Sequence, residues 1–235
     1  MQIIAHKNNL YNNKDFLQQV AYQKGKLTGI MLDIVKTKDD KFLIFSPIST
    51  NKITAFTIQN ENLEEVSYLD IFTLEEALDI LKDYQEKIIL NLLPLNEAVV
   101  VEEYEKIVLE NKHYLEELEK ILTNYQQLCL YVCSVSYNLL YHIKTLPNIK
   151  IGVLLSSANS NYIDVDFYVF PSELLNEKIL LQQLDISKEV MIQMQDCDDI
   201  SLVVSFLKEK MQQKKRAEEF QFITNYPNVF GCLQL

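Results

Sequence analysis

The sequence predicts an α/β fold in which eight parallel strands and their helices form a TIM-like (β/α)8 barrel. Short apolar runs rich in Val, Ile, Phe and Tyr alternate with amphipathic segments, which is typical of parallel βα units. The chain has 235 residues, a length at which such barrels occur as single units. No Pro-, Gly- or Ser-rich linker divides it, so we expect one domain over residues 1–235.

Nine runs have the length and composition of strands, and six segments have helical periodicity. The expected strands are Gln2–Ala5, Gly29–Val35, Phe42–Phe45, Ile88–Leu92, Leu128–Cys133, Ile149–Leu154, Val165–Phe170, Glu189–Met194 and Gln221–Thr224. The expected helices are Lys14–Lys24, Thr73–Lys82, Ala98–Tyr125, Ser136–Thr145, Ser172–Leu181 and Asp199–Met211. Thr73 and Glu76 have the spacing of a capping box, which predicts where the second helix begins.

Nine strands are one too many for an eight-stranded barrel, and the spacing of the second and third indicates where the extra one belongs. A parallel connection needs about a dozen residues or more, and there is no room for one between Asp33 and Ser46. We therefore expect Gly29–Val35 and Phe42–Phe45 to form a β-hairpin within residues 29–46. A tip at the centre of the Lys38–Lys41 turn predicts that Asp33 lies opposite Ser46.

Charge and composition exclude several classes of partner. Lys and Arg number 22 against 33 Asp and Glu, a formal net charge of −11, so we expect no nucleic acid partner. Arg216 is the only arginine and there are only four glycines. We therefore expect neither a phosphate site built on arginine side chains nor a Gly-rich phosphate-binding loop.

The apolar segments predict no membrane span, because none approaches the roughly 20 residues needed to cross a bilayer. The first residues lack a basic region followed by an apolar one, and the four cysteines form no CxxC pair. Cys129 and Cys133 share an apolar run, where we expect buried free thiols. We expect a reduced, cytoplasmic protein.

The segment Ala98–Tyr125 carries an apolar stripe, broken at Asn111, that resembles the seam of a coiled coil. A helix packed on a barrel produces the same stripe, and we favour this interpretation. The alternative is a structural protein that forms a homodimer through this helix.

Functional sites of such barrels lie at the carboxyl ends of the strands. The residues at these ends are His6, Asp33, Asn91, Ser134, Gln195 and Asn225.

Eight segments match, in order and spacing, the motifs of one enzyme family. They are Ile3–Lys7, Gly29–Asp39, Phe42–Pro47, Ile71–Leu78, Leu90–Leu95, Val132–Val135, Ile151–Leu154 and Phe222–Pro227. Through them nearly the whole chain resembles the glycerophosphodiester phosphodiesterase family. The resemblance implies a barrel of the phospholipase C-like phosphodiesterase type and a phosphoric diester hydrolase ancestry in lipid metabolism.

The resemblance also implies a set of site residues. The family hydrolyses its substrate with a divalent cation and two histidines that act as acid and base. His6 stands at the first histidine, whereas Ser46 stands where the second would be. Lys7 replaces an arginine beside His6, and Asn13 matches an asparagine of a substrate-binding turn.

The implied metal site is incomplete. Asp33 keeps one family carboxylate, but Met31 and Leu93 stand at the positions of the other two. Hard cations bind through several oxygen ligands, so we expect no cofactor, with weak Mg or Ca binding only at a rearranged site that combines Asp33 with Asp196 or Asp198. The favoured interpretation of the acidic cluster Asp196, Asp198 and Asp199 is that it caps the next helix. The favoured interpretation of Asp33 is a buried carboxylate satisfied by Lys7 or Ser46.

We therefore expect a degenerate family member, a pseudoenzyme that acts as a binding or interaction module. It would retain affinity for a phosphorylated small molecule through His6 and Lys7. Two interpretations of His6 stay open, an anion ligand and a strand-end residue bonded to a neighbour. The alternative function is an active phosphodiesterase with a rearranged metal site. His113 and His142 lie in expected helices, where we expect surface or packing roles.

Overall fold

The computed structural model describes just over half of the chain. The described residues are 2–6, 15–17, 20, 27–45, 55–69, 71–93, 104–135, 139–140, 148–155, 164–176, 189–194, 205 and 220–224.

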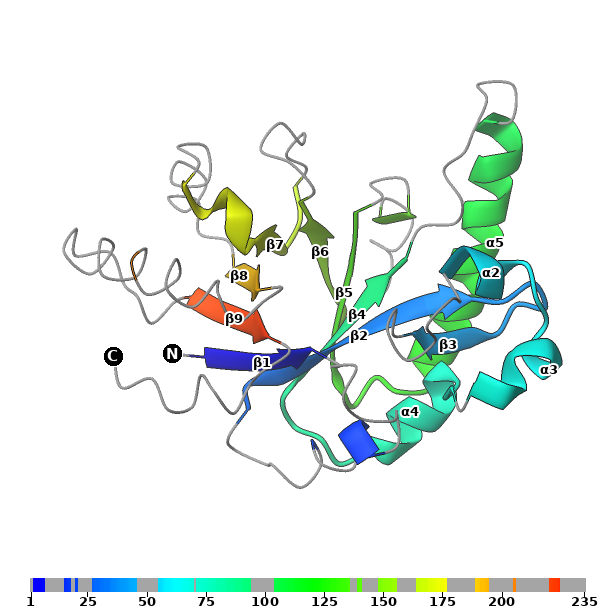
Figure 1. Cartoon of the computed structure of the whole chain (residues 1–235), viewed down its shortest axis with the longest axis horizontal. Coiled ribbons are helices and arrows are strands. Elements are labelled where there is room, and N and C mark those ends of the chain that lie inside the picture. Colours follow the sequence, from blue (N-terminus) through cyan, green and yellow to red (C-terminus); the bar gives the residue numbers. More distant parts are fainter. Residues whose placement is uncertain are drawn as a thin grey trace.

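Eight parallel strands close into a barrel, and a ninth lies outside the ring (Figure 1). The strands are β1 Gln2–His6, β2 Gly29–Lys36, β3 Phe42–Phe45, β4 Lys87–Leu92, β5 Cys129–Ser134, β6 Lys150–Leu154, β7 Phe167–Pro171, β8 Glu189–Met194 and β9 Phe220–Thr224. Neighbours follow the order β1-β9-β8-β7-β6-β5-β4-β2, and pairing of β1 with β2 closes the ring. The predicted TIM-like (β/α)8 barrel is confirmed.

The extra strand forms the predicted hairpin, but its register differs by one residue. Strand β3 runs antiparallel to β2 and pairs Asp33 with Phe45, so the prediction of Ser46 opposite Asp33 is wrong. The connection is a five-residue turn, Thr37–Lys41, closed by the Thr37 N–H donating to the Lys41 carbonyl. Asp40 adopts a φ of 62° in it. The sequence analysis assumed a two-residue tip, and the longer turn moves the register; Ser46 itself lies outside the described residues.

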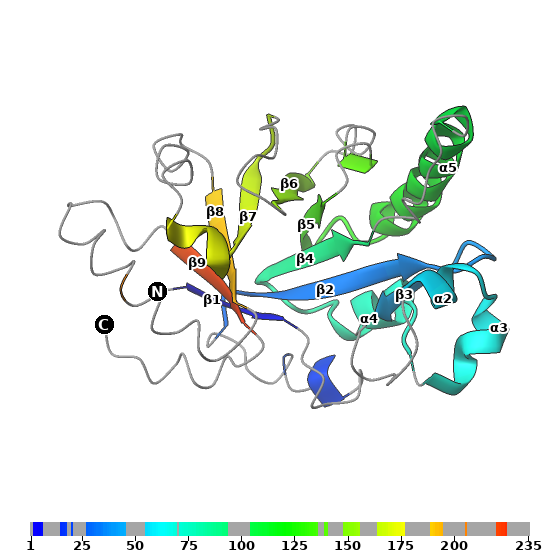
Figure 2. The same cartoon turned by 45° about the horizontal axis from the view of Figure 1, so that its top comes forward.

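The described helices are grouped on the hairpin side of the barrel. They are α2 Ala55–Gln59, α3 Leu63–Val66, α4 Leu74–Ile80 and α5 Tyr104–Thr123, with short 3-10 turns η1 Ser67–Leu69 and η3 Ser172–Asn176. Both views place α2 to α5 beside the β2–β3 hairpin (Figures 1 and 2). The N-cap of α4 is Thr73, whose hydroxyl accepts from the Glu76 N–H while Glu76 bonds back to the Thr73 N–H, as predicted.

Helices α2 and α3 were not predicted, because they are too short to show a helical period. Of the helix expected over Ser172–Leu181, the structure describes only the 3-10 turn η3 at its start. The helices expected over Lys14–Lys24, Ser136–Thr145 and Asp199–Met211 lie largely outside the described part of the chain.

Alternating strand residues build two separate layers of core. Outward-facing residues such as Leu32 and Leu90 pack beneath the helices. Inward-facing residues fill the barrel, and they are Ile4, Met31, Ile89, Tyr131, Cys133, Phe167, Val169, Met191 and Ile223.

Helix α5 packs on the outer layer. Its residues Tyr114, Leu115, Leu118 and Leu122 are buried there, and the Tyr114 ring meets the Phe42 ring edge-on at a centroid distance of 5.0 Å. The apolar stripe of this helix therefore covers the barrel over its C-terminal half, in agreement with the favoured interpretation.

A third apolar group, the hairpin cluster, lies at the far end of the hairpin. It consists of the buried Val35, Leu43, Phe45, Ile58 and Val66, with the partly buried Ala55, Leu63, Leu69, Ile71 and Leu93 packed against them. The Asp39 carboxylate accepts from the Leu63 N–H at 2.9 Å, which ties the start of α3 to the hairpin turn. Helices α2 and α3 thereby cover the part of β2 that extends beyond Asp33.

Gly152 is required by the barrel interior. A Cβ at this position would lie 2.3–2.5 Å from the ring atoms of Phe167, its register partner on β7. We expect Gly152→Ala to lower the free energy of unfolding by about 1–3 kcal/mol in urea denaturation, because the fully buried ring has no room to move. Combining it with Phe167→Leu should recover part of that loss; a Gly152→Ala protein as stable as wild type would contradict this packing.

Among the described helices, none is long and apolar enough to span a membrane.

Candidate functional site

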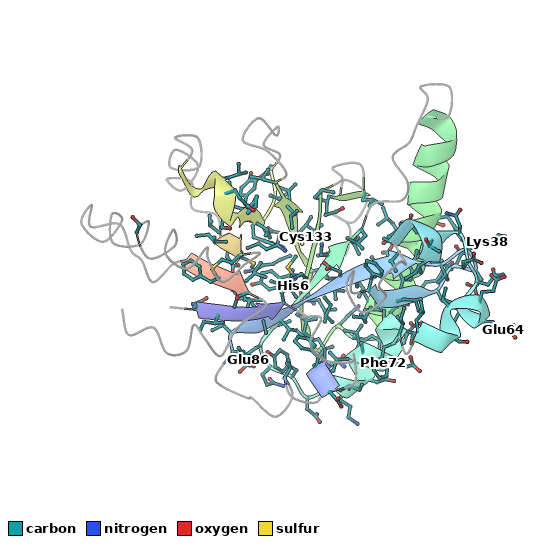
Figure 3. The ribbon with its side chains drawn as sticks, viewed as in Figure 1. His6, Lys38, Glu64, Phe72, Glu86 and Cys133 are labelled. Carbon is teal, nitrogen blue, oxygen red and sulfur yellow. The ribbon has the colours of Figure 1, made fainter. Side chains whose placement is uncertain are left out.

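Four polar side chains lie on the inner face of the barrel, across four neighbouring strands. They are His6 at the end of β1, Asp33 on β2, Asn91 on β4 and Cys133 on β5, and we call them the polar belt. Strand register places them together, because Asp33 pairs with Asn91 and Asn91 pairs with Cys133. Figure 3 labels the two ends of the belt, His6 on β1 and Cys133 on β5. The belt occupies the carboxyl-end half of the strands, where barrels of this type place their sites.

The Asp33 carboxylate is the centre of the belt and is only 8% exposed. Its Oδ2 lies 3.1 Å from Nε2 of His6, and its Oδ1 accepts from Nδ2 of Asn91 at 2.7 Å. Each carboxylate oxygen thus has a hydrogen-bond partner within the barrel wall. The prediction of a satisfied, buried carboxylate holds through these two residues, whereas the expected partners Lys7 and Ser46 lie outside the described residues.

Cys133 ends the belt in the barrel interior. Its Sγ donates to Oδ1 of Asn91 at 3.9 Å, a long contact of the kind that thiols make. Complete burial, and to a smaller extent the nearby Asp33 charge, raise the pKa of the Cys133 thiol well above its ordinary value. The group is therefore a neutral S–H donor and is not a nucleophile.

Among the described residues, the side chains at the positions of the other two family carboxylates do not fit a hard divalent cation. Met31, two residues before Asp33, is fully buried in the barrel interior beside Ile4 and Ile89. Leu93 packs against the hairpin cluster, so an apolar surface stands where a third oxygen ligand is implied. Mg²⁺ and Ca²⁺ take several oxygen ligands, and a thioether and an isobutyl group supply none. The donor chemistry of this end of the barrel disagrees with the metal that the family resemblance implies.

No group of three or more His, Cys, Asp or Glu side chains that could hold a metal is found among the residues that the structure describes. Asp196 and Asp198, which the sequence analysis considered for a rearranged site, are not among these residues. Lys7, Asn13 and Ser46 are likewise outside the described ranges, as are the strand-end residues Gln195 and Asn225.

Ser134, a predicted strand-end residue, has a structural role. It is fully buried, and its hydroxyl donates to the Leu92 carbonyl at 2.7 Å, which ties the end of β5 to the end of β4. Asn91 was also predicted at a strand end, but its bond to Asp33 was not. Its position two residues after the inward-facing Ile89 was the signal that could have placed it beside Asp33.

His113 lies away from the polar belt. It extends from α5 to the hairpin turn, where its Nε2 lies 3.1 Å from Oδ2 of Asp40. Although burial acts to raise the pKa of Asp40, hydrogen bonds from Lys36 and His113 hold that pKa below its ordinary value. This contact fastens α5 to the hairpin and fits the predicted surface or packing role; His142 is outside the described residues.

The opposite end of the barrel is closed by a network of charged and polar groups, which we call the base network. Lys87 and Lys150 both bond to the Glu189 carboxylate, which also accepts from Gln221 and from the Tyr131 hydroxyl. The two ammonium groups lie 5.2 and 5.0 Å from the centroid of the Tyr131 ring, within cation–π distance. Lys87, Lys150 and Glu189 begin strands β4, β6 and β8, and Gln221 and Tyr131 lie near the starts of β9 and β5. The network therefore joins elements far apart in sequence.

Glu189 gives the base network a pH dependence. Burial acts to raise the pKa of Glu189, but hydrogen bonds from Lys87 and Gln221 hold it below its ordinary value of 4.5. Its stabilising contribution is therefore complete above pH 4.5 and is lost as the pH falls through the lower folded-state pKa. We expect Glu189→Gln to lower the free energy of unfolding at pH 7 by about 2–3 kcal/mol, because Lys87 is left without its counter-ion.

The measurement is urea denaturation from pH 7 to pH 3. Wild type should lose stability below pH 4.5 more steeply than Glu189→Gln does. Glu117→Gln, which breaks an exposed pair with Lys120, is the control and should match wild type. Equal pH profiles for wild type and Glu189→Gln would contradict the role of the network.

The chain is similar in structure to several solved glycerophosphodiester phosphodiesterases. One from Parabacteroides distasonis is 13% identical and has a TM-score of 0.70, over 97% of this chain and 94% of its own. A phosphodiesterase from Oleispira antarctica, solved with the product sn-glycerol-3-phosphate, is 17% identical with a TM-score of 0.71, over 98% and 95%. One from Agrobacterium tumefaciens is 12% identical with a TM-score of 0.63, over 99% and 100%.

No protein-family sequence model and no curated protein sequence matches the chain. The structural likeness shows that the chain has the fold of these phosphodiesterases over nearly its whole length.

Proposed function

We propose that this barrel, which has the fold of glycerophosphodiester phosphodiesterases, does not carry out metal-dependent hydrolysis and instead binds a phosphorylated small molecule at the carboxyl ends of its strands. One observation carries the proposal. The single remaining family carboxylate, Asp33, is bonded through both oxygens to His6 and Asn91, and the other two ligand positions are the apolar Met31 and Leu93.

Hydrolysis of a phosphodiester requires stabilisation of negative charge and a general acid for the leaving group, and the residues at the family positions supply neither. Negative charge develops on the phosphoryl oxygens in the transition state and must be stabilised, which the family does with a cation. The leaving alkoxide must also receive a proton, and Ser46, at the position of the second histidine, cannot act as a general acid near neutral pH. Both losses act against the same reaction.

Ligand binding has different requirements, and part of the site meets them. His6 remains at the end of β1 with 14% of its side chain exposed, and Lys7 follows it in the sequence. The Oleispira antarctica phosphodiesterase of the same fold was solved with sn-glycerol-3-phosphate. A glycerol phosphate or a related phosphomonoester is therefore the ligand class that we propose for this chain.

Two assays test the proposal. The first incubates the protein with glycerophosphocholine, glycerophosphoethanolamine and bis-p-nitrophenyl phosphate, each with Mg²⁺, Ca²⁺ and Mn²⁺. We expect no turnover above that of His6→Ala. Turnover that is lost in His6→Ala would instead support an active phosphodiesterase with a rearranged metal site.

The second assay measures binding of sn-glycerol-3-phosphate by titration calorimetry without added metal. We expect saturable binding that weakens at least tenfold in His6→Ala, since one hydrogen-bonding or charged contact contributes about 1.4 kcal/mol or more to affinity. His113→Ala is the matched control, because His113 contacts the hairpin turn and should leave binding unchanged. Absence of binding to wild type would contradict the proposed ligand class.

A further inference from the structure

We infer that Asn91 is a positioning residue, which fixes the Asp33 carboxylate and through it the orientation of the His6 imidazole. The inference rests on the proposed function, because it concerns how the ligand site is held. In a metal-binding barrel the bound cation would orient the Asp33 carboxylate, and here we infer that the hydrogen bonds of the polar belt orient it.

The amide of Asn91 has one favourable orientation. Its Nδ2 donates to Oδ1 of Asp33 at 2.7 Å, and its Oδ1 lies 3.9 Å from the Cys133 thiol, which can only donate to it. A flipped amide would place two acceptor oxygens against each other and an N–H group against the S–H. Because Asn91 is only 8% exposed, water cannot readily replace the lost bonds.

The fixed carboxylate in turn orients His6. An ionised carboxylate only accepts hydrogen bonds, so the hydrogen in the 3.1 Å contact belongs to Nε2 of His6. Because Asn91 holds Oδ1 of Asp33, Oδ2 is fixed in place and favours the His6 tautomer with hydrogen on Nε2 and one orientation of the ring. Carboxylates that bond to histidine fix the tautomer and the ring orientation in the same way in other protein sites. Nδ1 of the ring is then directed away from Asp33.

Filling the barrel interior does not by itself require polar side chains at the positions of the polar belt. Two residues before His6, Asp33 and Asn91 on their strands lie the apolar Ile4, Met31 and Ile89, which fill the barrel interior. A buried ionic or polar group adds little to stability compared with apolar side chains that fill the same space. Three linked hydrogen bonds do, however, restrict the geometry of the group at their end, and that group is His6.

The test uses Asn91→Leu, which keeps the volume of the side chain and removes its donor. The readout is the ¹⁵N spectrum of the His6 ring at constant pH, which distinguishes hydrogen on Nε2 from hydrogen on Nδ1. We expect wild type to show hydrogen on Nε2, and Asn91→Leu to show a mixture of tautomers with at least tenfold weaker binding of sn-glycerol-3-phosphate. Thr37→Val is the control: it removes buried hydrogen bonds at the hairpin turn and should leave the His6 spectrum unchanged.

If Asn91→Leu does not fold, Cys133→Ala decides the question, because it removes only the last donor of the belt. It should shift the His6 spectrum in the same direction by a smaller amount, whereas Ile89→Val, beside it in the barrel interior, should not. A His6 spectrum unchanged in the folded Asn91 or Cys133 variant would overturn the inference. If the spectrum changes but wild type binds no sn-glycerol-3-phosphate, the positioning role stands and the proposed ligand class fails.

Discussion

Replacing Met31 and Leu93 together by glutamate is expected to make the stability of this protein depend on divalent cations. Met31 is fully buried beside Asp33, so the variant places new carboxylates in a part of the barrel that is now apolar. Without a cation we expect a loss of about 3–5 kcal/mol in the free energy of unfolding, the cost of buried charges without partners. A cation at one hundred times its dissociation constant should restore about 2.7 kcal/mol.

The measurement is thermal and urea denaturation of the Met31→Glu, Leu93→Glu variant with Ca²⁺, Mg²⁺ or EDTA. The control is Met31→Gln with Leu93→Gln, which has similar volumes and no added charge, and it should not respond to cations. Wild type should not respond either. A wild type that is stabilised as strongly as the glutamate variant would show that a cation already binds there, and an unresponsive glutamate variant would show that these two positions do not flank an ion.

The second large effect is expected from a double-mutant cycle on His6 and Asp33. Asp33→Leu leaves His6 and Asn91 facing an apolar group, and His6→Leu leaves the carboxylate with one partner fewer. We expect each single substitution to lower the free energy of unfolding by about 3 kcal/mol or more. The double variant should be more stable than the sum predicts, by about 1–3 kcal/mol, because two apolar groups then face each other.

Urea denaturation of the four proteins gives the coupling. The control cycle combines Asp33→Leu with Thr37→Val, four residues further along the chain at the start of the hairpin turn, where distance predicts additivity. If His6→Leu and Asp33→Leu were also additive, the 3.1 Å contact would not be the interaction that satisfies Asp33.

Much of the fold follows from the sequence, because local composition determines the strands of such a barrel. All nine strands lie where the apolar runs predicted them, and the short span from Val35 to Phe42 correctly excluded a crossover helix. The register of that hairpin was wrong because Asp40 takes a left-handed conformation in a five-residue turn. No glycine or asparagine marks that residue, so the turn type could not be inferred from residue types.

The candidate site was harder to predict because its contacts cross strands. The identity of Asp33 as a buried, satisfied carboxylate could be inferred, but its partners depend on how far each strand is shifted along its neighbour. Asn91 faces Asp33 only in the observed register of β2 with β4. Of the two thiols expected to be buried, Cys133 is buried, whereas Cys129, the first residue of β5, is exposed. The role of Cys133 as a donor to Asn91 also needed the β4–β5 register.

For the helices too, features within the segment could be predicted, whereas contacts with residues far away in the sequence could not. Helix α4 could be predicted to the residue at its start because Thr73 and Glu76 cap it within one turn. Helices α2 and α3 form because they cover Leu93 and the end of β2, and nothing within their own few residues indicates that contact.

The most direct test of the account is a crystal structure of the protein grown with Ca²⁺, Mg²⁺ or Mn²⁺ at high concentration. We expect Asp33 to remain bonded to His6 and Asn91, with no ion within coordination distance of its oxygens. A fully coordinated ion on Asp33, with the bonds to His6 or Asn91 broken, would contradict the claim that the polar belt stands where the family holds its metal.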